Sequence, residues 1–267
     1  MYTSLISAPQ LAAIIGQSVR ILDCRARLGD AEFGSRAYAG GHISGAIRAD
    51  LDRDLAAAPG VGGRHPLPDR ETLAARAQSW GINDEDQVVV YDDASGAFAA
   101  RAWWCLRWLG HEATALLDGG LGAWKQPLTA DATTIVPGNF SIRACLTRTI
   151  DAATLADQLS EHELVDARTA ERFNGEQEPI DPVAGHIPGA SCLPFQDNLE
   201  ANGQFKPASD LGARFAALSD DVICYCGSGV SAAHNVLAMR IAGRAEPILY
   251  PGSWSEWIVD PARPRAP

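Results

Sequence analysis

The sequence predicts an α/β protein of two tandem domains, each a parallel sheet flanked by helices. Three observations predict this fold: an internal duplication, uninterrupted apolar runs of strand length, and segments of helical spacing between those runs. The duplication is plain in two motifs. Gly41–Ala46 (GHISGA) returns as Gly185–Ala190 (GHIPGA), and Leu116–Trp124 (LLDGGLGAW) returns in the same order as Leu249–Trp257 (LYPGSWSEW).

Two further pairs complete the repeat. An apolar run that ends in Asp-x-Arg occurs at Ile21–Arg25 and at Leu164–Arg168, and VVVYD at Val88–Asp92 matches VICYC at Val222–Cys226. The spacing between the copies shortens after the GHIxGA motifs, so the first copy carries extra chain there. That extra chain, 48–68, is rich in Gly, Pro and Asp and is expected to be a long loop.

The second copy shows how each domain is built. We expect strands at 164–165, 222–225 and 248–250, and helices at 152–159 and 231–242. Because the strands are apolar without alternation, the sheet should be parallel and covered on both faces. The predicted organisation is a first domain at 1–130, a linker at 131–141 and a second domain at 142–267.

Composition excludes several classes of protein. The chain has 267 residues and a net charge of −11, from 22 Lys and Arg against 33 Asp and Glu, which disfavours nucleic acid and anionic membranes as partners. No apolar run is as long as a membrane span, and the N-terminus lacks the pattern of a secretory signal. The six cysteines form no zinc-type CxxC pairs, which is typical of free thiols in a reducing cytoplasm.

The stretch Cys226–Ala232, CGSGVSA, is the strongest candidate for chemistry. It follows an apolar run and precedes a predicted helix, the place where parallel α/β sheets bind ligands. Gly227 and Gly229 allow a sharp turn whose backbone amides, with those of Val230 and Ser231, can cradle an anion. These amides and the positive end of the helix favour a thiolate, so Cys226 is expected to be a nucleophile rather than an inert buried thiol. The first copy has Asp92 at this position.

With GHI[PS]GA, the Asp-x-Arg strand ends and a single cysteine loop in its second copy, the chain resembles the rhodanese-fold sulfurtransferases over nearly its whole length. CGSGVSA is similar to CG[ST]GVTA, the active loop of the 3-mercaptopyruvate sulfurtransferases. Thiosulfate sulfurtransferases of the same architecture typically carry basic residues there, and this loop has none. The resemblance implies transfer of a sulfane sulfur from a small anionic donor through a Cys226 persulfide to a thiol such as thioredoxin, or to cyanide, without a cofactor or metal.

The resemblance also implies further site residues. Ser228 would work with His65 and Asp52, both from the first domain, to move a proton or polarise a carbonyl. Arg172 matches one of two arginines that bind the donor carboxylate, but Ile180 stands at the place of the second. Arg64 or Arg101 could supply the missing cation.

Other interpretations remain open at this stage. Ile180 keeps thiosulfate as an alternative donor, and a sulfur-carrier or binding module with little turnover is a third possibility. A Cys-x5-Arg phosphatase or arsenate reductase is excluded, because its arginine position is Ala232 here.

Several conspicuous residues are expected to be structural. His42, His186, Arg25 and Arg168 recur in both copies, including the copy without the cysteine. Trp103, Trp104 and Trp108 share one predicted helix and should pack in the core or at an interface.

Overall fold

The computed structural model describes all 267 residues, which divide into two compact units. The first comprises residues 1–57, 68–146 and 201–204, and the second comprises 58–67, 147–200 and 205–267. The loop 58–67 therefore packs with the second unit, although in sequence it lies between two strands of the first unit, at 46–48 and 87–91.

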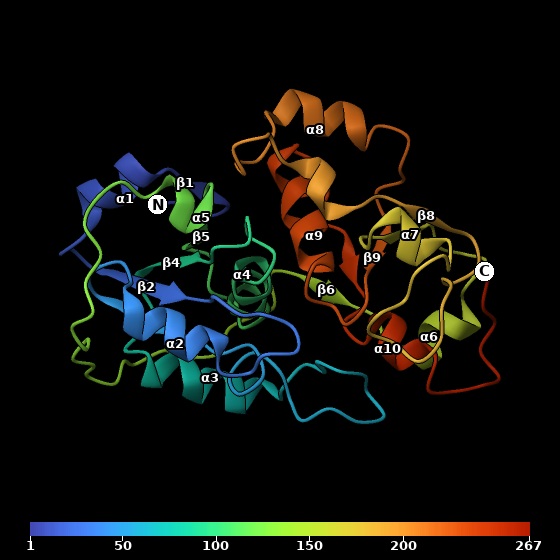
Figure 1. The fold of residues 1–267 in the computed structure, drawn as a ribbon, viewed down its shortest axis with the longest axis horizontal. Coiled ribbons are helices and arrows are strands. Elements are labelled where there is room, and N and C mark those ends of the chain that lie inside the picture. The colour runs from blue at the N-terminus through green and yellow to red at the C-terminus, as the bar shows by residue number, and fades with distance from the viewer. The chain divides into compact units, whose positions relative to one another are not determined.

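Each unit contains a five-stranded parallel sheet, drawn in Figure 1. The strand order is β1-β5-β4-β2-β3 in the first unit and β6-β10-β9-β7-β8 in the second. The two orders are equivalent element by element. This equivalence confirms the predicted duplication and the α/β class.

The first unit contains ten elements. These are β1 (Leu5–Ile6), α1 (Ala8–Ile14), β2 (Val19–Asp23), α2 (Phe33–Gly40), β3 (Ala46–Arg48), α3 (Arg70–Ser79), β4 (Gln87–Tyr91), α4 (Ala99–Trp108), β5 (Thr114–Leu117) and α5 (Gly120–Ala123).

The second unit repeats this order with one additional 3-10 turn, η1. Its elements are β6 (Arg148–Thr149), α6 (Ala152–Asp157), β7 (Leu164–Asp166), α7 (Ala170–Phe173), β8 (Ala190–Cys192), η1 (Phe195–Asn198), α8 (Ala208–Arg214), β9 (Ile223–Tyr225), α9 (Ala232–Ile241), β10 (Ile248–Leu249) and α10 (Ser253–Trp257).

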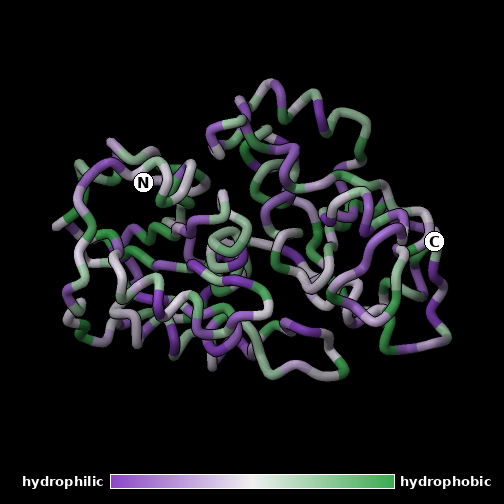
Figure 2. Tube along the Cα trace, viewed as in Figure 1, coloured by the Kyte–Doolittle hydropathy of each residue, from purple (hydrophilic) through white to green (hydrophobic).

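The central strands of each unit carry buried apolar residues. Figure 2 colours the chain trace by the hydropathy of each residue. Val88, Val89 and Val90 of β4 are fully buried, as expected for a strand covered on both faces. Trp103 and Trp104 of α4 are also fully buried, which confirms their predicted packing role. None of the helices is both long and apolar enough to cross a membrane.

The stretch 131–141, which the sequence predicts to be a linker, has no helix or strand. It is nevertheless fixed to the first unit. The amide of Gly138 donates to the Gln78 carbonyl at 2.8 Å, and Phe140 is 2% exposed.

Matching contacts secure the repeated motifs. Arg25 donates to Asp23 and to the Gly41 carbonyl, and Arg168 likewise donates to Asp166 and to the Gly185 carbonyl. The same contacts occur in the unit that lacks the cysteine loop.

The two motif histidines also match. His42 stacks on Tyr38 and its Nδ1 contacts the Tyr38 carbonyl, while His186 does the same with Phe173. These contacts agree with the structural role predicted for the repeated residues.

Candidate active site

Cys226 is the first residue after β9, the central strand of the second sheet. Its carbonyl accepts from the Trp254 amide at 3.0 Å, and its own amide donates to Ser253 Oγ at 3.0 Å. The residue is 2% exposed. The sulfur is thus attached to a backbone fixed at the carboxyl edge of the sheet, where α/β proteins bind their ligands.

Ser253 is a site residue that sequence reasoning missed. It has a left-handed backbone, with φ of 53°, and is fully buried. Its hydroxyl accepts from the Cys226 amide and donates to the Tyr250 carbonyl at 2.9 Å. The first copy has Gly120 here, with φ of 56°. A serine where the repeat has glycine was the signal that could have revealed this residue.

The loop after Cys226 presents backbone donors without internal acceptors. The amides of Gly227, Ser228, Val230 and Ser231 donate to no atom of the chain. Gly229 turns the loop with φ of +73°, and a Cβ there would lie 2.2 Å from the Pro251 carbonyl oxygen. Helix α9 begins directly afterwards, so its positive end and the amides point to the same region. The arrangement is suited to stabilising an anion on or beside the cysteine.

The structure brings Ser228 and His65 together. Ser228 Oγ lies 2.7 Å from His65 Nδ1, and the two residues are 4% and 8% exposed. His65 belongs to the loop 58–67 of the second unit. Asp52 belongs to the first unit, where it is exposed and its amide donates to Asp50 Oδ1 at 2.9 Å. A contact between Asp52 and His65 stays a prediction.

Arg172, from α7, is held rigidly near the loop. Its Nε and Nη2 donate to both oxygens of Glu178, and Nη2 also donates to Asp181 at 3.0 Å. Burial opposes ionisation of Glu178, but the amides of Asp181 and Ile180 and the Arg172 guanidinium bring its pKa below the usual value. An ionised Glu178 keeps the Arg172 guanidinium oriented.

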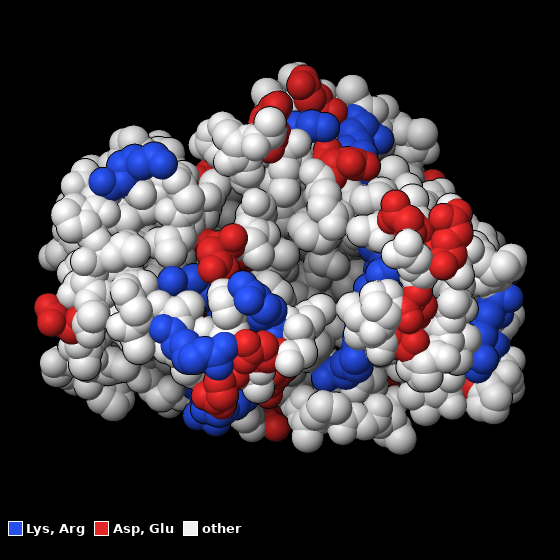
Figure 3. All heavy atoms as spheres, in the orientation of Figure 1, with Lys and Arg blue, Asp and Glu red and all other residues white.

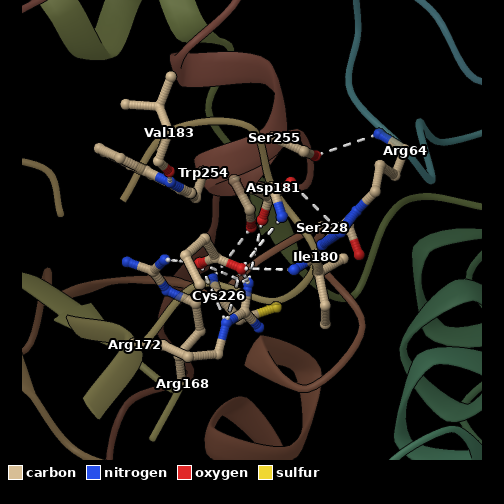
Figure 4. A network of polar contacts seen from close by, with 12 residues as sticks. Arg64, Arg168, Arg172, Ile180, Asp181, Val183, Cys226, Ser228, Trp254 and Ser255 are labelled. Carbon is tan, nitrogen blue, oxygen red and sulfur yellow. Dashed lines mark hydrogen bonds and ion pairs between the residues drawn. The ribbon is translucent and has the colours of Figure 1, made fainter. Parts of the chain in front are cut away.

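Ile180 contributes only its backbone to this network. Its amide donates to Glu178 Oε1 at 3.0 Å, and its side chain is 41% exposed. Arg64 is the cation found nearby, since its Nη1 lies 3.3 Å from Asp181 Oδ1. Figure 4 shows Arg64 entering the network from one side and Arg172 from the other. Arg101, the other candidate, is buried in the first unit and donates to the Leu55 carbonyl.

Cys224 and Cys192, the cysteines of the same sheet, are less suited to nucleophilic chemistry. All six are free thiols. Burial raises the pKa of Cys224 far above its ordinary value, and burial together with Asp166 raises the pKa of Cys192 to about 11. No group of three or more His, Cys, Asp or Glu side chains could hold a metal ion.

A cysteine loop at the carboxyl edge of a parallel sheet, duplicated without its cysteine, defines an α/β protein with one thiol centre and one scaffold copy. Comparison with known families identifies the family to which this protein belongs. The rhodanese-like domain model matches residues 7–127 and again 151–260. The chain belongs to the rhodanese family.

Relatives and solved structures agree with this assignment. A Pseudomonas aeruginosa protein named "Probable 3-mercaptopyruvate sulfurtransferase" is 52% identical, over 98% of this chain and 97% of its own length. A Mycobacterium tuberculosis protein named "Putative thiosulfate sulfurtransferase SseB" is 42% identical, over 97% and 95% of the two chains. The crystal structure of SseA from Escherichia coli, described among the 3-mercaptopyruvate sulfotransferases, superimposes with a TM-score of 0.83 at 32% identity, covering 96% of this chain and 100% of that one.

Proposed function

We propose that this sulfurtransferase moves a sulfane sulfur from 3-mercaptopyruvate, through a persulfide on Cys226, to an acceptor thiol. The observation that carries the proposal is the loop itself. A buried cysteine stands beside four amides with no internal acceptor and a serine–histidine pair. The names of the relatives support the same class of reaction.

In the first step the Cys226 thiolate attacks the sulfur of 3-mercaptopyruvate. A sulfur–sulfur bond forms as the carbon–sulfur bond breaks, so Cys226 carries the persulfide and pyruvate leaves as its enolate. The loop amides and the start of α9 stabilise the negative charge on sulfur. Atoms and electrons balance without an external oxidant or reductant.

The enolate must then gain a proton to become pyruvate. Ser228 and His65 are hydrogen-bonded at 2.7 Å and can supply it, with the serine hydroxyl facing the donor and the imidazole restoring its proton. Asp52 would orient the imidazole, as a carboxylate does in a serine–histidine–carboxylate relay.

In the second step an acceptor thiolate attacks the outer sulfur and regenerates the Cys226 thiolate. Thioredoxin is a suitable acceptor, and cyanide would serve in an assay, with thiocyanate as product. The cytoplasm, predicted from the free cysteines, is a compartment in which such thiols stay reduced.

Thiosulfate is the second candidate donor. Two observations favour it: Ile180 stands where the family pattern has an arginine, and the relative from Mycobacterium tuberculosis bears the name of a thiosulfate sulfurtransferase. Against it, the loop Gly227–Ser231 contains no basic residue to match a dianion.

Steady-state kcat/KM with each donor and one common acceptor tests the proposal. A strong preference for 3-mercaptopyruvate is the expected result. A preference for thiosulfate would replace the donor, and turnover of neither would favour a sulfur carrier.

A further inference from the structure

A cavity of about 570 Å³ lies at the amino ends of the strands of the first sheet, on the edge opposite to the turn that carries Asp92. It is lined by residues at the starts of β2 and β4, by the chain before β5, by Met1 and Tyr2, and by Arg143. All of these belong to the first unit. A cavity of this size suits a small organic ligand, and no residue of the Cys226 loop contributes to it.

His111 lines this cavity and has an acceptor that the chain leaves unused. The residue is 3% exposed, and its Nε2 lies 2.9 Å from the Asp86 carbonyl oxygen. Because a carbonyl oxygen only accepts, Nε2 carries the hydrogen and Nδ1 keeps a lone pair. Nδ1 forms no hydrogen bond within the chain and is not sealed from solvent. Burial lowers the pKa of His111, so the imidazole is neutral at neutral pH and Nδ1 stays an acceptor.

Negative charge is in excess around the cavity. Its charged groups are the carboxylates of Asp84, Glu85 and Glu112, the guanidinium of Arg143 and the α-amino group of Met1. Arg143 is already engaged, since its Nη2 lies 3.4 Å from Asp84 and 3.6 Å from Glu85. The Glu112 carboxylate forms no hydrogen bond or ion pair within the chain. One carboxylate next to His111 in sequence is therefore left to receive a cation.

Another part of the cavity wall is apolar and fixed in place. Tyr2, Ile14 and Val19 line the cavity and also pack against the core of the first unit. Gln87 fixes the backbone of Tyr2, because its Oε1 accepts from the Tyr2 amide at 2.8 Å and its Nε2 donates to the Tyr2 carbonyl at 2.9 Å. The cavity is thus formed without a ligand and offers a surface for a hydrocarbon group.

The charge of the whole chain favours a cationic ligand. The net charge is −11, which attracts cations and repels anions. On the face drawn in Figure 3, however, acidic and basic side chains are interspersed. General attraction therefore does not by itself choose a place for a cation, and local acceptors such as those of this cavity must do so.

We propose that this cavity is a binding site for a small primary amine, bound in its protonated form, that carries an apolar body. The ammonium group donates to His111 Nδ1 and faces the Glu112 carboxylate, while the body lies on the wall of Tyr2, Ile14 and Val19. An alcohol of the same shape keeps a donor for the imidazole but lacks the charge, so it binds more weakly. A carboxylate in place of the ammonium group faces a lone pair and a like charge, and is rejected.

Amide NMR of the ¹⁵N-labelled protein during titration with 2-phenylethylamine tests the site. 2-Phenylethanol is the neutral probe of matched shape, and 3-phenylpropionate is the anionic one. The amine should bind with a Kd in roughly the millimolar range, as expected for so small a ligand, and should shift amides at 17–19, 84–87 and 111–113. It should bind about 2- to 5-fold more tightly than the alcohol, and the propionate should not bind at this place.

Two variants separate the charge from the hydrogen bond. Glu112→Gln should weaken binding of the amine about 2- to 5-fold and leave the alcohol unchanged, because it removes only the charge. His111→Phe removes the acceptor and should weaken binding of both probes about 2- to 10-fold. Glu161→Gln, at an exposed carboxylate of the second unit, is the charge-matched control and should change neither Kd.

The same spectra show whether His111→Phe is folded, and Glu112→Gln, at an exposed residue, gives the answer if it is not. Amine-induced shifts confined to other parts of the chain, or no shift at all, would overturn the site. Equal affinity for the amine and 3-phenylpropionate would overturn the proposed class of ligand. Equal losses for the amine and the alcohol in Glu112→Gln would overturn the role of its charge.

Discussion

The two copies place different residues at the same point of the same fold. In the first unit Asp92 follows β4, and in the second Cys226 follows β9. Both carbonyls accept an equivalent amide, from Leu121 at 2.8 Å and from Trp254 at 3.0 Å. The two residues therefore have equivalent backbone hydrogen bonds, and the two loops differ in whether their amide groups have acceptors.

The Asp92 loop satisfies its amides internally. Asp92 Oδ1 accepts from Ala94 and Gly96, and Oδ2 accepts from Phe98 and Ala99, all between 2.8 and 2.9 Å. Burial raises the pKa of Asp92, whereas the four amide donors, each of which needs a lone pair, favour the carboxylate. In this copy a side chain of the turn itself therefore satisfies the amides.

The Cys226 loop keeps the same kind of donors and lacks the carboxylate. The comparison teaches that the turn between strand and helix in this fold is an anion cradle, filled permanently in one copy and left open in the other. A thiolate, a persulfide or a donor anion can then take the place that the Asp92 carboxylate fills in the first unit.

Removing the sulfur should have the largest effect. Cys226→Ser is expected to abolish transfer from both donors, because a hydroxyl cannot form the persulfide. Cys145→Ser, at an exposed cysteine, should leave activity unchanged. Thiocyanate formation with cyanide as acceptor measures both, and residual transfer by Cys226→Ser would refute a persulfide at this residue.

The serine–histidine pair should matter next. His65→Gln and Ser228→Ala are expected to lower kcat with 3-mercaptopyruvate by about 10²–10⁴-fold, the usual range for general acid–base catalysis. Thiosulfate turnover should fall less, because its leaving group needs no carbon protonation. His162→Gln, at a histidine whose Nε2 lies 3.3 Å from Gln158 Oε1, is the matched control. Equal losses for both donors would contradict a role in enolate protonation.

The filled cradle can be tested through stability. Asp92→Asn replaces one of the two acceptor oxygens with an NH2 group that opposes two backbone N–H donors, and should reduce the free energy of unfolding by about 2–4 kcal/mol. Asp93→Asn, at the exposed neighbour, should have almost no effect. Urea titration followed by tryptophan fluorescence gives both values. Equal stability of the two variants would mean that Asp92 does not hold its loop.

The smallest expected difference concerns Gly120 and Ser253, which share a left-handed backbone. Gly120→Ala adds a Cβ 2.5 Å from the Asp92 carbonyl oxygen and should cost about 2 kcal/mol or more. Ser253→Gly loses the hydrogen bonds to the Cys226 amide and the Tyr250 carbonyl but relieves backbone strain, so its net cost should be smaller than that of Gly120→Ala. Urea midpoints decide this, and similar losses in both variants would remove the predicted asymmetry.

The duplication and its sheets could be predicted from the sequence because repeated motifs and apolar strands are local signals. GHIxGA and the apolar strand before Cys226 each lie within a few consecutive residues, so the sequence alone indicates the order of elements. The helix expected at 231–242 is α9, at Ala232–Ile241, and ends near Gly243, which has a positive φ.

The environment of the cysteine could be predicted only in part. The pairing of His65 with Ser228 spans 163 positions, and only the family resemblance suggested it. Glu178 and Asp181 were missed because carboxylates in a polar loop resemble a solvated surface until their arginine partners are located. The packing of 58–67 with the second unit includes a close approach of Gly63 to Ser255, which has no local sequence signal.

The most direct test of the account is mass spectrometry of the protein after brief exposure to 3-mercaptopyruvate without an acceptor. The account predicts the addition of one sulfur atom, located on the peptide that contains Cys226 and lost when a thiol is added. Sulfur found on another cysteine, or no addition despite turnover, would contradict it.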